Sequence, residues 1–71
     1  MEVREAIKEL ISMMNDSVKP EPVRAAAAEG LGYAGGGEAR AALAKMMNDS
    51  VKPASVRTAA ARALGRATTA S

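Results

Sequence analysis

The apolar residues of the first part of the chain fall at helical spacing. Between residues 2 and 15 they recur every three or four positions, which predicts an amphipathic helix. Polar residues 15–17 and the following prolines should end this helix. A second helix is expected over about residues 22–34, with Pro22 at its first position, and the glycine run at 35–37 should end it as a flexible connector. The apolar stripe of the first helix consists of Val3, Ile7, Leu10, Ile11 and Met14.

The same pattern returns 33 residues later. Residues 13–20 are identical to residues 46–53, and more than half of the positions in the period match their counterparts. The second copy therefore predicts helices over about residues 38–48 and 55–68, the latter with Ser55 as its N-cap. The short alanine- and threonine-rich tail that follows should fray.

A period of this size is typical of stacked supersecondary units that bury their apolar faces only against neighbouring units. We therefore predict one all-α domain over residues 1–71, with repeat 1 at about 2–35 and repeat 2 at about 37–69. The expected architecture is an α-α superhelix of four helices in two antiparallel pairs. Leu31 and Leu64 should each be buried in their own repeat, because the second helices otherwise offer mainly alanine and glycine.

Composition limits what such a short chain can do. A domain of 71 residues buries only about 60% of the surface of its unfolded chain, so its core needs a supplement. The absence of cysteine and histidine excludes disulfides and the usual zinc ligands, which leaves association. The chain shows no apolar run of membrane-spanning length and no signal-peptide pattern, so we expect a cytoplasmic protein with no membrane partner.

The sequence contains few residues that could form a catalytic or ligand-binding site. No acid–base pair stands at a spacing that suggests a shared pocket, and the glycine run lacks the lysine of a phosphate-binding loop. One carboxylate in each loop, Asp16 and Asp49, falls far short of a calcium site. We expect no enzyme activity and no catalytic, cofactor or metal site. The duplicated Asn-Asp-Ser-Val-Lys-Pro loops either grip a ligand together or, as we favour, only cap their helices.

Charge is divided unevenly between the repeats. Residues 1–36 hold four basic and six acidic side chains, a net charge of −2, whereas residues 37–71 hold six basic and two acidic, a net charge of +4. Glu29 and Arg62 are equivalent positions, so stacked second helices would place them side by side. Binding to nucleic acid stays an alternative that the few clustered cations disfavour. Its candidate residues are Lys52, Arg57, Arg62 and Arg66.

The second helix of each copy carries the pattern Val-Arg-x-x-Ala-Ala-x-x-Leu-Gly, at residues 23–32 and 56–65. With the aspartate-containing turn before it, this pattern resembles the HEAT repeat, in particular the short bacterial and archaeal HEAT-like units also seen in phycobilin lyases. The resemblance implies a helical superhelix that binds proteins, with Asp16 and Asp49 linked to Arg24 and Arg57 between repeats. On the resemblance alone, an accessory subunit of a lyase-like enzyme is a second alternative.

Differences between the copies point to association. Ile7 and Ile11 of the first helix become Arg40 and Ala44 in the second copy, so the N-terminal helix is the more apolar one. A terminal repeat is expected to be polar outside, and we therefore expect a homo-oligomer, with a dimer favoured. A simpler explanation, which does not exclude association, is that Ile7 or Ile11 covers the open end of the helix at 22–34. Candidate interface residues are Val3, Ile7, Ile11, Met14 and the lone aromatic, Tyr33.

Overall fold

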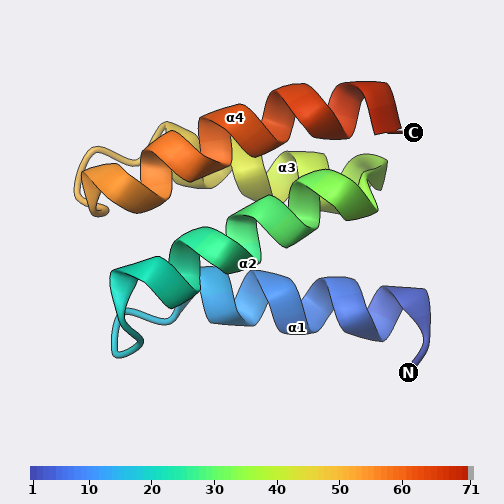
Figure 1. The fold of residues 1–71 in the computed structure, drawn as a ribbon, viewed down its shortest axis with the longest axis horizontal. Helices are drawn as coiled ribbons and strands as arrows, with labels where there is room; N and C mark the ends of the chain where they lie inside the picture. The colour runs from blue at the N-terminus through green and yellow to red at the C-terminus, as the bar shows by residue number, and fades with distance from the viewer. Residues whose placement is uncertain (71) are drawn as a thin grey trace.

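The computed structural model describes residues 1–70 and shows four α-helices over that range (Figure 1). Each helix runs antiparallel to the next along the chain, so the first and second form one hairpin and the third and fourth form another. The predicted all-α architecture of four helices in two antiparallel pairs is confirmed. The helices are α1 (Val3–Asn15), α2 (Glu21–Ala34), α3 (Gly36–Met47) and α4 (Ala54–Ala70).

The two hairpins stack so that α2 lies along α4, which is the most extensive contact between helices. Helix α1 packs on α2, and α3 packs on α4. Helix α2 also contacts α3, so it touches each of the other three helices and contacts both helices of the second hairpin. Its alanines and glycines explain this central place, because small side chains let neighbouring helices approach closely.

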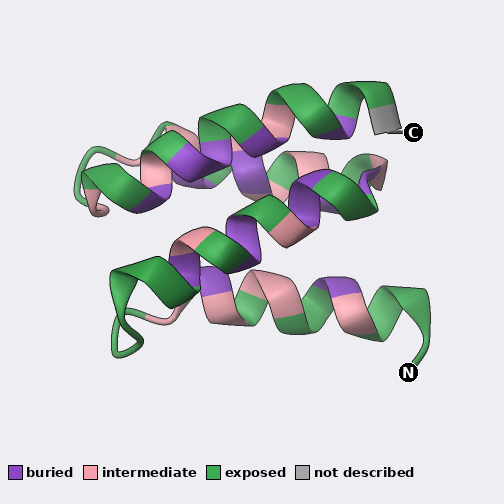
Figure 2. Cartoon of the chain, viewed as in Figure 1, coloured by how far each residue is buried: buried purple, intermediate pink, exposed green. Residues whose placement is uncertain are grey.

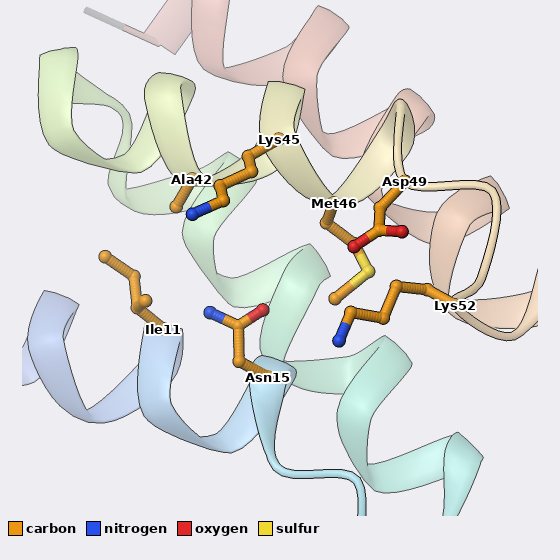
Figure 3. A pocket seen from close by; sticks show the side chains of 7 residues that line it. All are labelled: Ile11, Asn15, Ala42, Lys45, Met46, Asp49 and Lys52. Atoms are coloured by element: carbon orange, nitrogen blue, oxygen red, sulfur yellow. The ribbon is translucent and has the colours of Figure 1, made fainter.

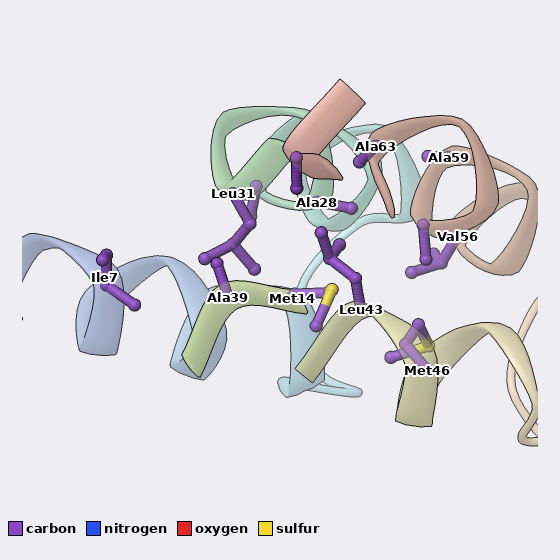
Figure 4. Close-up of a cluster of buried hydrophobic side chains, with 13 residues drawn as sticks. Ile7, Met14, Ala28, Leu31, Ala39, Leu43, Met46, Val56, Ala59 and Ala63 are labelled. Atoms are coloured by element: carbon purple, nitrogen blue, oxygen red, sulfur yellow. The ribbon is translucent and has the colours of Figure 1, made fainter. Parts of the chain in front are cut away.

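The core runs through the middle of the stack (Figure 2). Its five largest fully buried side chains lie beside buried alanines from α2, α3 and α4 (Figure 4). Leu31 is fully buried as predicted, but Leu64 is only half-buried and packs at the edge of the core. The prediction for Leu64 was wrong because, over residues 1–70, no further helix covers this side of α4, where Ala61 and Gly65 are also exposed. The five large core residues are Met14, Leu31, Leu43, Met46 and Val56.

The second helix of each repeat begins directly after a proline, and the carbonyl of that proline accepts the first hydrogen bonds of the helix. The Val23 amide donates to the Pro20 carbonyl at 3.0 Å, and the Val56 amide donates to the Pro53 carbonyl at 3.2 Å. Pro22 therefore takes the second helical position instead of the first. The predicted N-cap role of Ser55 is wrong as well: this serine lies inside α4, and its hydroxyl donates to Glu21 Oε1 of repeat 1 at 2.7 Å.

A single residue, Gly35, connects α2 to α3. Its backbone angles of φ 68° and ψ −164° lie in a region that only glycine adopts readily. Gly36 and Gly37 form the first turn of α3, so the expected three-residue flexible connector is wrong. The counterpart of Gly35 in the second copy is Thr68, where α4 continues to Ala70 instead of turning. The predicted helix end at residue 68 is thus too early, and Ser71 lies outside the described residues.

Candidate functional site

The predicted interface residues do not form one exposed surface. Met14 is fully buried and Ile7 is 9% exposed, because the apolar stripe of α1 packs inside the stack. Val3 and Tyr33 are 73% and 69% exposed. Ile11 is half-buried. The structure thus supports the alternative that α1 covers the core, and it removes Ile7 and Met14 from the candidate interface.

A groove of about 310 Å³ lies between α1, α3 and the loop that follows α3 (Figure 3). Its apolar lining comes from Ile11, Ala42 and Met46. Sequence reasoning missed this groove because its residues come from both repeats and are not close along the chain. The polar side chains that line it are Asn15, Lys45, Asp49 and Lys52.

The aspartates and arginines of the turns do not contact one another as the resemblance implied. Arg24 is 3% exposed, and its Nε donates to the Met14 carbonyl at 3.0 Å, at the end of α1 in its own repeat. The Asp16 carboxylate instead accepts the Val18 amide at 3.0 Å. A cation is favourable at the C-terminal end of a helix, so Arg24 acts as a clamp between the two helices of the hairpin. Its Nη2 is buried without a hydrogen-bond partner.

The second repeat repeats this arrangement more loosely. Arg57 Nε donates to the Met47 carbonyl at 3.4 Å and is only partly buried. The Asp49 carboxylate accepts the Val51 amide at 3.2 Å. In both loops the aspartate therefore serves the turn itself, as Asx turns do. The favoured interpretation that these aspartates cap their helices is thus wrong in this detail, because their carboxylates accept hydrogen bonds within the loops.

Three of the four cations considered for nucleic acid lie in different surroundings in the structure. The Arg66 guanidinium carbon lies 4.6 Å from the centre of the Tyr33 ring, an arrangement typical of a cation–π contact. Lys52 lines the groove, and Arg57 donates a hydrogen bond to the carbonyl of Met47 at the end of α3.

Over residues 1–70, no cluster of three potential metal-ligating residues occurs and no helix has the length and hydropathy needed to cross a membrane.

Exposure differs systematically between equivalent positions of the repeats. On repeat 2, Ala61 and Gly65 are exposed and Leu64 is half-buried, whereas their counterparts on repeat 1 are all buried beneath repeat 2. We call these three residues the second-repeat face. The counterparts are Ala28, Leu31 and Gly32.

Repeat 1 shows the opposite difference at other positions. Val23, Ala26 and Ala34 are exposed on α2, whereas their counterparts on α4 are buried against repeat 1. We call these three residues the first-repeat face. Sequence reasoning missed both faces, although the identity of the copies held the signal: a position buried in one repeat and exposed in the other marks a place where a neighbour is missing. The counterparts are Val56, Ala59 and Ala67.

Comparison with known proteins agrees with this repeat architecture. The family model described as HEAT repeats matches residues 7–71, which includes most of both hairpins. No curated protein and no solved structure was found to match the chain.

Proposed function

This chain belongs to the HEAT repeat family, and from this premise we propose that it is a non-enzymatic protein-binding module that associates with further copies of itself. HEAT repeats generally mediate interactions between proteins. Stacked helical repeats bind through extended surfaces and depend on neighbouring repeats for burial of their apolar faces. A small core of alanine side chains adds to this dependence, since each alanine buries little area.

The observation that carries the proposal is the second-repeat face. Ala61, Leu64 and Gly65 retain the side chains that repeat 1 uses to bind repeat 2, yet over residues 1–70 nothing covers them to the same extent. In a repeat stack, such a face is where the next unit binds. A partner that covers it would stabilise the folded state, because it binds the native chain and not the unfolded one.

Solution mass tests the self-association. We expect light scattering to give a mass that rises above 7.3 kDa as protein concentration increases, with a dimer as the first product. The melting temperature should rise over the same concentrations, since association is linked to folding. A monomeric mass throughout, together with a melt independent of concentration, would refute self-association.

A further inference from the structure

We propose that copies of the chain stack head to tail, with the second-repeat face of one copy on the first-repeat face of the next. This inference rests on the proposed self-association and specifies its geometry. The contact between α2 and α4 inside the monomer provides the template, because it already joins two repeats that are related by a shift of 33 residues. A second copy adds the same kind of contact after α4.

The closest part of the contact between α2 and α4 can be repeated between copies without a steric clash. Within the monomer, a Cβ placed on Gly32 would lie 2.9 Å from Ala63, so α2 and α4 are in close contact there. The same contact between copies joins Gly65 to the residue equivalent to Ala63, which is Gly30 of the next copy. Glycine in place of alanine leaves at least as much room for the approaching helix. Gly65 is exposed, and a Cβ built on it meets nothing within 4 Å, so this side of α4 is open.

The polar residues beside this contact are also complementary. Tyr33 and Arg66 are equivalent positions that stack within the monomer. In the next copy, Tyr33 therefore meets the free side of Arg66, and the planar guanidinium stacks between two tyrosine rings. One turn earlier on the same helices, the equivalent positions Glu29 and Arg62 carry opposite charges, so this part of the contact also pairs unlike residues.

Charge favours this arrangement over a symmetric dimer. The +4 half of one copy faces the −2 half of the next. In a two-fold dimer through the second-repeat face, Arg62 and Arg66 would instead face their own copies, which like-charge repulsion disfavours. A head-to-tail contact leaves one face free at each end, so it produces open stacks whose length depends on concentration.

Two substitutions block the two faces separately. Gly65→Leu places a side chain in open space in the monomer, but in the stack this side chain occupies the position of the next helix. Ala26→Arg changes an exposed residue whose counterpart, Ala59, is 3% exposed against repeat 1. Gly37→Leu is the matched control, because a Cβ there also meets nothing within 4 Å and Gly37 belongs to neither face.

Sedimentation of the variants, alone and mixed, tests the proposal. The wild type and Gly37→Leu should associate, whereas Gly65→Leu and Ala26→Arg should each lose association at the same concentration. An equimolar mixture of the two blocked variants should form a one-to-one dimer that grows no further, because one free face of each kind remains. Circular dichroism checks folding, and Ala34→Arg replaces Ala26→Arg if that variant unfolds.

The other outcomes overturn the proposal in distinguishable ways. If the wild type associates but Gly65→Leu does so equally well, or if the mixture stays monomeric, the head-to-tail geometry is wrong while self-association stands. If either blocked variant alone forms dimers, the contact is symmetric. A wild type that is monomeric at every concentration overturns both the geometry and the proposed self-association.

Discussion

Gly32 of α2 and Ala63 of α4 leave no room for a side chain between their helices. A Cβ built on Gly32 would lie 2.9 Å from the Cα, Cβ and carbonyl oxygen of Ala63, which is closer than real Cβ atoms approach other heavy atoms. The obstacle is partly backbone, so a small rotation of one side chain does not relieve it. The contact between the two repeats therefore depends on a glycine at this position.

Gly32→Ala should destabilise the monomer by about 1–3 kcal/mol, because the methyl group overpacks the contact between α2 and α4. The equivalent change, Gly65→Ala, should stabilise the monomer by about 0.5–1 kcal/mol, since alanine is the better helix former and the site is open. Urea unfolding at a concentration that keeps the protein monomeric measures both. Equal effects at the two positions would contradict the asymmetry.

Leu31→Ala should cost about 2–5 kcal/mol of unfolding free energy, as expected for a fully buried leucine. Leu64→Ala should cost clearly less in the monomer, because its side chain is only half-buried. Thermal melts followed by circular dichroism compare the two variants. If Leu64→Ala proves as damaging as Leu31→Ala under monomeric conditions, α4 is more covered than the structure shows.

Arg24→Ala should destabilise the protein by about 1–3 kcal/mol, because it removes the hydrogen bond to the Met14 carbonyl and leaves a buried gap. The matched change Arg57→Ala should cost less, since that contact is longer and more exposed to water. Chemical denaturation of the two single variants decides the point. A larger loss for Arg57→Ala would refute the proposed clamp role of Arg24.

Replacing Ile7 with Arg and Ile11 with Ala, their counterparts in the second copy, should destabilise the fold by about 2–5 kcal/mol. The reason is that Ile7 packs in the core and Ile11 lies against it. Helicity and melting temperature should both fall, whereas Val3→Ala at a 73% exposed position should change neither measurably. A fully helical double variant with an unchanged melt would return Ile7 to the candidate interface.

Glu29 and Arg62 should show a coupling of up to about 1 kcal/mol at low salt. Both side chains are exposed, and they lie one turn before the stacked pair of Tyr33 and Arg66 on the same two helices. A double-mutant cycle with Glu29→Arg and Arg62→Glu measures the coupling. It should fade as salt rises, since the Debye length is about 10 Å at 0.1 M. No coupling at low salt would place the two residues apart.

Apolar spacing and the repeat were sufficient to predict four helices and their pairing, because both features follow from local side-chain order. They were insufficient for Leu64, since exposure there depends on whether another repeat follows and not on the residue itself. The start of α3 was missed for a different reason: Gly36 and Gly37 are poor helix formers, but packing of the helix overrides that weak preference.

Contacts between packed helices were the hardest feature to predict from the sequence. Arg24 could be identified as part of the turn, but its choice of the Met14 carbonyl over Asp16 depends on how closely the two helices of the hairpin approach. The groove lined by Ile11 and Lys45 likewise exists only once the second hairpin lies on the first. A repeated sequence thus predicts the unit well and the junction between units poorly.

The one-residue joint at Gly35 bears on how the molecule transmits force. A joint of one residue offers only two soft backbone torsions, and here both are held at angles that suit glycine almost alone. One hairpin therefore cannot pivot against the other without separating α2 from α4. Relative movement of the hairpins is opposed by the contact between α2 and α4 and not by the joint itself, so the stiffness of the pair of repeats comes from its packed core.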